Sequence, residues 1–191
     1  MIRFTLVHDI HCSTERFWEL YLDSDFTRAL IQDGLGFDDC DIQSVTRDEG
    51  VVRRVMVVRP RIDVPQAVAK VLGPRLSYRE EGVYRHDTGT WEWTTRLGVM
   101  ADKIRMGGSQ RVEPAAADRC RRVADLWVDA KIFGLGGLVE KAAEKNMRKG
   151  WAESARWMNA WLDRAEDPAR AEASGAEAPQ TEAPQTEPSL A

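Results

Sequence analysis

The sequence predicts an α+β fold in which a curved antiparallel sheet of about six to seven strands wraps around a long C-terminal helix, with two short helices after the first strand. Two observations support this expectation. Between residues 37 and 132, with one interruption, apolar side chains recur with the period of two that is typical of half-buried strands. From residue 137 to about 165 they recur at helical spacing without a proline. The sheet needs a cover for its apolar face, and this helix is the only predicted element long enough to supply it.

The N-terminal segment predicts one strand and two short helices. Residues 2–10 alternate apolar and polar side chains, as a half-buried strand does. Ser13 and Thr14 supply an N-cap for a short helix that carries Phe17, Trp18, Leu20 and Tyr21. A second short helix is expected over residues 24–32, because Asp23 or Ser24 can cap its start and Gly34 can end it.

The middle of the chain predicts the remaining strands and an inserted helix. Asp48-Glu49-Gly50 is typical of a hairpin turn, because glycine tolerates positive φ. Pro65 in a first turn and Gly73 at the end favour a helix over residues 65–72. Residues 113–118 are expected to be a loop between the last two strands. The predicted strands cover residues 40–46, 51–58, 76–85, 90–100, 103–112 and 119–132.

Composition divides the chain into a body and a tail. Residues 1–165 are expected to form one domain, and residues 166–191 a disordered acidic tail rich in Pro, Gln and Glu. The segment from residue 165 onward holds six of the 31 acidic residues and one of the 27 basic ones, so the net charge of −4 comes from the tail. Its low hydrophobicity and like charge do not offset the entropy of ordering.

Several functional classes are disfavoured by the sequence. Three cysteines, Cys12, Cys40 and Cys120, are odd in number and far apart, which favours a reducing compartment and a cytoplasmic location. The N-terminus is charged too early for a signal peptide. The longest uncharged apolar run is much shorter than the roughly 20 residues that span a bilayer. We expect no metal and no cofactor, because His8 and His11 point to opposite faces of their strand and no Cys/His cluster occurs elsewhere.

A glycine-rich segment precedes the last helix. Gly134, Gly136 and Gly137 do not match the spacing of a dinucleotide fingerprint, and no strand follows the helix to complete a nucleotide-binding unit. A tight turn into the helix is therefore the better interpretation.

The order of elements resembles the helix-grip fold of the START-like and birch-pollen-allergen-like superfamily (SRPBCC), over residues 1–164. The local marks are Phe17-Trp18-Glu19-Leu20, the insert at residues 64–73, and the segment 132–140 before the last helix. The last two resemble a bacterial branch labelled as a domain of unknown function. Members of the superfamily include lipid and sterol carriers, hormone receptors and some polyketide cyclases. The resemblance therefore implies a ligand cavity between sheet and helix, and no single reaction.

Strand alternation and helical spacing assign the side chains that would face this cavity. Met and Trp offer adaptable and broad apolar area, which suits an elongated or ring-shaped ligand. The alternatives are a closed core without ligand for the apolar set, and a solvent-facing strand for the polar set. The predicted apolar lining consists of Trp91, Trp93, Leu97, Met106, Leu126, Val128, Met147, Trp151 and Met158. The side chains that would orient a ligand head group are Arg54, Tyr78, Glu80, Tyr84 and His86.

Arginine is dense along the predicted strands. The body is nearly neutral, so we expect no nucleic-acid partner. Most of these arginines are expected on the solvated face of the sheet, with a basic rim that makes transient contact with an anionic membrane surface as a further hypothesis. They are Arg53, Arg54, Arg59, Arg61, Arg75, Arg79, Arg85, Arg96, Arg105, Arg111, Arg119, Arg121 and Arg122.

We therefore expect non-enzymatic binding or transport of a hydrophobic small molecule, in particular a lipid or related amphiphile. An enzyme of the polyketide cyclase or dehydratase type is the alternative, with Glu80, His86 or Tyr84 as proton carriers. A protein-interaction module is the third hypothesis. If its tail is the determinant, deleting residues 168–191 should abolish partner binding.

Overall fold

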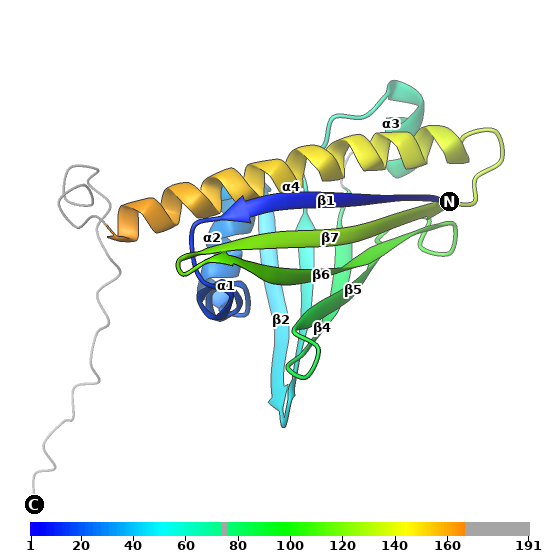
Figure 1. The fold of residues 1–191 in the computed structure, drawn as a ribbon. Helices are drawn as coiled ribbons and strands as arrows, with labels where there is room; N and C mark the ends of the chain where they lie inside the picture. Colours follow the sequence, from blue (N-terminus) through cyan, green and yellow to red (C-terminus); the bar gives the residue numbers. More distant parts are fainter. Residues whose placement is uncertain (74–75, 167–191) are drawn as a thin grey trace, which may run out of the picture.

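In the computed structural model, which describes residues 1–73 and 76–166, seven strands pair into one antiparallel sheet. The strand order is β1-β7-β6-β5-β4-β3-β2, so β1 pairs with the last strand of the chain (Figure 1). The predicted fold class is confirmed. The strands are β1 (Ile2–Ile10), β2 (Asp39–Asp48), β3 (Val51–Arg59), β4 (Tyr78–Arg85), β5 (Thr90–Leu97), β6 (Ile104–Ala116) and β7 (Arg119–Ala130).

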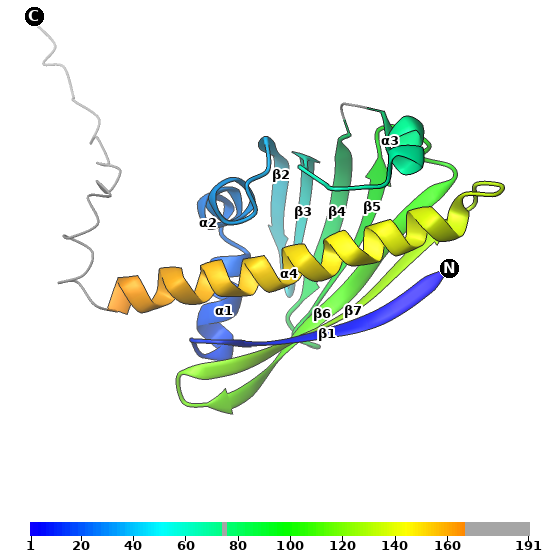
Figure 2. The ribbon, with the colours of Figure 1, turned by 90° about the horizontal axis from the view of Figure 1, so that it is seen from above.

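The long C-terminal helix α4 lies across one face of the sheet and packs against β1 and β7. Figure 2 shows α1 and α2 beside the C-terminal half of α4, and α3 near its N-terminal end. This is the helix-grip arrangement that the sequence predicts. The helical elements are α1 (Thr14–Tyr21), α2 (Ser24–Ala29), the π-helical turn η1 (Leu30–Gly34), α3 (Gln66–Leu72) and α4 (Gly136–Glu166).

Side-chain caps start the two short helices after β1. The Oγ of Ser13 and the Oδ1 of Asp23 each accept a hydrogen bond from the backbone N–H three residues later, at 3.2 and 2.8 Å. The second predicted helix, 24–32, is wrong in its extent. Regular α-helical bonding ends at Ala29, and the N–H of Leu35 donates to the carbonyl of Leu30 at 3.0 Å, which is the spacing of a π-helical turn.

Several strand boundaries differ from the predicted ones, most of all those of β4, β5 and β6. The loop expected over residues 113–118 is largely part of β6, which continues through Pro114 to Ala116. A register shift between these two residues marks an irregularity, and such sites accommodate a proline because it has no N–H to donate. β4 begins at Tyr78 and β5 ends at Leu97, so both strands are shorter than predicted.

The glycine-rich segment before α4 forms the tight turn that the sequence predicts. Gly134 has a φ of +70°, a conformation that L side chains rarely adopt. A Cβ at Gly136 would collide with the carbonyl oxygen of Ala130. The predicted tail, residues 166–191, lies outside the described residues from 167 onward. Its hypothesised role in partner binding is therefore not tested by the structure.

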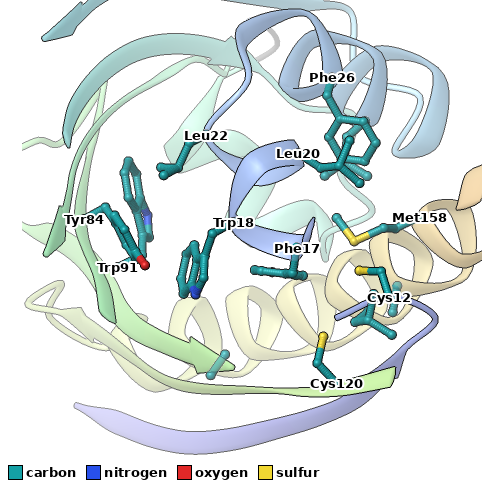
Figure 3. Close-up of a cluster of buried hydrophobic side chains, with 14 of the residues drawn as sticks. Cys12, Phe17, Trp18, Leu20, Leu22, Phe26, Tyr84, Trp91, Cys120 and Met158 are labelled. Carbon is teal, nitrogen blue, oxygen red and sulfur yellow. The ribbon is translucent and has the colours of Figure 1, made fainter. Parts of the chain in front are cut away.

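The main hydrophobic cluster lies where α1, α2 and the C-terminal half of α4 meet the sheet. Figure 3 shows Phe17 at its centre, between Trp18 and Met158. Phe17 and Met158 are completely buried. The Phe17 ring lies edge-on to Trp18, with centroids 5.1 Å apart, and stacks on Tyr21 at 5.6 Å. This cluster fixes α1 to the sheet and to α4.

Trp91 of β5 pairs with Tyr84 of β4, and its completely buried indole ring extends over Gly82 of the same strand. A Cβ at Gly82 would overlap the indole carbons of Trp91. We expect Gly82→Ala to lower the free energy of unfolding, measured by urea denaturation, by about 2 kcal/mol, because the enclosed ring has no room to shift. Trp91→Phe should relieve the overlap, so the double variant should lose less than the two single losses combined. Additive losses would contradict this contact.

Candidate functional site

A cavity of about 240 Å³ lies between the inner face of the sheet and α4. Its wall takes side chains from the sheet and from α4, with α2 and η1 at one end and α3 and the preceding segment 60–64 at the other. The volume is slightly below the roughly 300–1,000 Å³ that is usual for small-molecule pockets. The space therefore suits a small or medium-sized ligand.

Five of the predicted apolar lining residues lie in the wall of this cavity. They are Trp93, Leu97, Met106, Met147 and Trp151. The rings of Trp93 and Trp151 are stacked, with centroids 5.6 Å apart and an interplanar angle of 27°, so they join β5 to α4. The predicted inward orientation of alternate residues on β5 is confirmed by its burial pattern.

The other predicted apolar residues lie outside the cavity wall. Trp91, Leu126, Val128 and Met158 are buried in the protein interior. Trp91, Leu126 and Met158 belong to the cluster around Phe17, where α1 and α4 cover the sheet. The closed-core interpretation therefore describes the region of this cluster. The cavity lies beside it, and Trp93 belongs to both.

The polar candidates divide in the same way. Arg54, Tyr78 and Glu80 line the cavity. Tyr84 is buried against Trp18, with ring centroids 4.4 Å apart. His86 lies in the exposed turn after β4, because the strand ends one residue earlier and its alternation does not continue. Tyr84 and His86 are therefore not placed to contact a ligand in this cavity.

Arg54 of β3 is a buried cation at the α1–α2 end of the cavity, with 4% of its surface exposed. Its Nη1 donates hydrogen bonds to the carbonyl of Tyr21 at 2.8 Å and to the Oγ1 of Thr27 at 2.7 Å. The guanidinium lies over the rings of Tyr21 and Trp91, 5.2 and 4.8 Å from their centroids. Its Nε has no hydrogen-bond partner. The hydrogen-bond acceptors and rings in direct contact with this guanidinium group are all neutral.

Arg122 of β7 is a second buried cation in the wall, with 2% of its surface exposed. Its expected position on the solvated face of the sheet was wrong. Arg122 is two residues from the inward-facing Ala124 on β7, so strand alternation in the sequence already places it on the inner face. Its Nη2 donates to the carbonyl of Trp151 at 2.8 Å and to the Oγ of Ser154 at 3.0 Å. The guanidinium lies 4.6 Å from the centroid of the Trp151 ring.

Two pKa values show how burial acts around Arg122. Desolvation lowers the pKa of Arg122 to about 10, so the side chain remains charged at neutral pH. Desolvation, together with the nearby Arg122 charge, lowers the pKa of His8 to about 4. His8 is therefore neutral at physiological pH, and its Nδ1, 3.4 Å from the Nη2 of Arg122, can act as an acceptor.

Glu80 of β4 is the acidic side chain of the cavity wall. Burial raises its pKa to about 7, although the nearby Arg54 charge acts in the opposite direction. Burial also raises the pKa of Tyr21 to about 12 and that of Tyr78 well above its ordinary value. Both tyrosines are neutral hydroxyls at physiological pH, whereas Glu80 exchanges its proton near neutrality.

Sequence reasoning missed the side chains that α1 and α2 contribute to the wall. Tyr21, Phe26 and Thr27 line the cavity. They come from two short helices, and the periodicity of the sequence does not determine how these helices dock on the sheet. Their helical spacing predicts a buried face, but it does not distinguish core from cavity.

Gly150 leaves open space in the part of the wall that α4 forms. It lines the cavity, and a Cβ at this position would meet no atom within 4 Å. Glycine inside a helix costs about 1 kcal/mol relative to alanine. Gly150→Ala should therefore raise the free energy of unfolding by about 1 kcal/mol, as measured by urea denaturation. A loss of stability would show that the space is closed.

No group of three or more metal-binding side chains occurs in residues 1–73 and 76–166. The two histidines of the N-terminal segment are separated: His8 faces Arg122, whereas the Nδ1 of His11 lies 2.8 Å from the Oδ1 of Asp163. Within the described ranges, none of the helices is both long enough and apolar enough to span a membrane.

Solved structures with the same fold are numerous, at low sequence identity. The ZhuI aromatase/cyclase from Streptomyces sp. R1128 superposes with a TM-score of 0.64 at 12% identity, covering 88% of this chain and 97% of that chain. A START superfamily protein from Mycobacterium smegmatis has a TM-score of 0.57 at 13% identity, with 84% and 98% coverage. The protein TTHA0849 from Thermus thermophilus has a TM-score of 0.58 at 16% identity, with 92% and 100% coverage. These similarities establish the START-like helix-grip fold.

The sequence comparisons are consistent with the resemblance to a branch of unknown function. No functionally curated protein matches the chain. A family model described as "Protein of unknown function (DUF2505)" matches residues 5–162. With this match over most of its length, and with the helix-grip fold of its structural neighbours, the chain belongs to the DUF2505 family.

Proposed function

We propose that this protein binds a hydrophobic small molecule in the cavity between the sheet and α4. The observation that carries the proposal is the largely apolar cavity wall with a few polar side chains at defined positions, which is the usual composition of a ligand site. Trp93 and Trp151 supply broad apolar surface there, and Met106 and Met147 supply adaptable surface.

The distribution of polar groups favours an amphiphile, such as a lipid or a related molecule. Arg54 and Arg122 lie at the end near α1 and α2, and Glu80 lies between this end and the apolar remainder of the wall. The opposite end, near α3, is lined by Val64, Val68, Leu72, Leu76, Leu97, Ile104 and Val139. Transport of the ligand to or from an anionic membrane belongs to the same proposal, and transfer between vesicles measures it.

Binding of a neutral apolar ligand tests the proposal. Isothermal titration of the full chain with octanol should give saturable binding, and native mass spectrometry should detect the complex. Gly150→Leu places a side chain in the open space of the wall and should weaken octanol binding about tenfold or more, since a loss of 1.4 kcal/mol is tenfold. Lys149→Leu is the matched control on α4, because the Lys149 side chain is 68% exposed. Absence of saturable binding, or equal binding by both variants, would contradict the proposal.

An acid–base enzyme is a second candidate, favoured by one observation. The pKa of Glu80, raised to about 7 by burial, suits proton transfer in the cavity near neutral pH. Tyr84 and His86, the other two proton carriers considered, lie outside the wall. Glu80→Gln should therefore abolish turnover of a cyclisable polyketide-like substrate without preventing its binding. Unchanged turnover would exclude Glu80 as the acid or base.

A further inference from the structure

We propose that the ligand of this cavity is an amphiphile with a carboxylate group, and that the carboxylate lies between Arg54 and Arg122. This inference rests on the proposed function and names the class of ligand for the same cavity. It is carried by two buried cations that share one cavity wall and have no carboxylate partner.

The hydrogen bonds of both guanidinium groups go to neutral atoms. Arg54 donates to a carbonyl and a hydroxyl, and Arg122 donates to another carbonyl and another hydroxyl. In residues 1–73 and 76–166, neither side chain forms an ion pair with an acidic group. The Nε of each is buried without a partner. Burial of a charge without a counter-charge is unfavourable by several kcal/mol.

Several arginines on the solvated face of the sheet form ion pairs with acidic side chains of the chain. Arg59 pairs with Asp39 at 2.6 Å, and Arg121 pairs with Asp9 at 3.2 Å. Arg111 contacts two acidic side chains. Several exposed arginines therefore have carboxylate partners, although exposed ion pairs contribute little, whereas the two buried arginines have none in the described residues. This arrangement points to a counter-charge that comes from outside the chain.

Glu80 does not neutralise the two cations at neutral pH. Its pKa of about 7 means that it carries only part of a negative charge there. The wall therefore keeps an excess positive charge of between one and two. A monoanion matches this excess, and a carboxylate is planar, so it can accept paired hydrogen bonds from a guanidinium group.

A matched pair of ligands with the same chain length tests the assignment. Isothermal titration of the full chain at neutral pH should show octanoate binding at least about tenfold more tightly than octanol, because hydrogen bonds to charged groups contribute more than neutral ones. Arg54→Met and Arg122→Met should each remove most of this preference. Arg111→Met, at an exposed and paired position, should leave it unchanged. Octanol binding by the same variants shows that their cavity is still formed.

Each outcome separates this inference from the proposed function. If octanol binds as tightly as octanoate, the carboxylate assignment is wrong and the binding function stands. If neither ligand binds, the proposed function fails and the assignment fails with it. If both methionine variants fold, bind octanol and keep the octanoate preference, the carboxylate does not lie between these arginines. Tighter binding of octyl phosphate than of octanoate would overturn the choice of carboxylate.

Discussion

Replacing Phe17 with alanine should lower the free energy of unfolding by about 4 kcal/mol. The side chain is completely buried and contacts the rings of Trp18 and Tyr21. Its removal leaves a void between α1, the sheet and α4 that the neighbouring rings fill only in part. The effect should extend to the cavity, because Tyr21 follows on the same helix and its carbonyl holds Arg54.

Urea denaturation measures this loss, and thermal unfolding should show a decrease in Tm of about 10 °C for a domain of this size. Glu19→Ala is the matched control on α1, since the Glu19 side chain is 65% exposed. We expect that control to change stability by less than about 0.5 kcal/mol. A Phe17→Ala loss of about 1 kcal/mol or less would be too small for a cavity-forming substitution in a rigid core.

Replacing Glu80 with glutamine should raise the free energy of unfolding by about 3 kcal/mol in alkaline buffer and change it little in acid. Burial raises the folded-state pKa to about 7, from an ordinary value of 4.5. The folded state therefore binds the proton more tightly than the unfolded state does. Stability of the natural protein falls as pH rises through this window, and glutamine, which does not ionise, removes the fall.

Urea denaturation at several pH values gives the free energy of unfolding of both proteins. The difference between them is the contribution of Glu80. His8 has the opposite effect, because a folded-state pKa lowered to about 4 makes stability rise with pH from there to its ordinary value of 6.5. Both proteins contain His8, so its contribution cancels. Glu81→Gln, at a half-exposed position on the same strand, is the control and should change the free energy of unfolding by less than about 0.5 kcal/mol. If the free energy of unfolding depended on pH in the same way for the natural protein and for Glu80→Gln, Glu80 would be solvated in the folded state.

Most of the fold could be predicted because its elements have strong local signals. The alternation of Trp91, Trp93 and Leu97 determines which face of β5 is buried. The caps at Ser13 and Asp23 mark the starts of α1 and α2. The boundaries that failed depend on hydrogen-bond patterns that composition does not encode, such as the π-helical turn after Ala29 and the irregular pairing near Pro114.

The site could be predicted only in part, for a different physical reason. Alternation assigns a face of the sheet, but it does not say which part of that face a helix covers. Leu126 and Met106 both face inward, yet the first lies in the cluster under α1 and the second in the cavity wall. Arg122 could have been found from its register with Ala124. Thr27 could not, because its place in the wall depends on how α2 docks.

The stacked indoles of Trp93 and Trp151 give the protein an internal optical reporter. One ring belongs to the sheet and the other to α4, and both line the cavity. Stacked indoles couple their electronic transitions, and the coupling depends on their separation and relative orientation. Any ligand that moves α4 relative to β5 should therefore alter the exciton signal in circular dichroism. The occupancy of the cavity can then be followed in unlabelled protein.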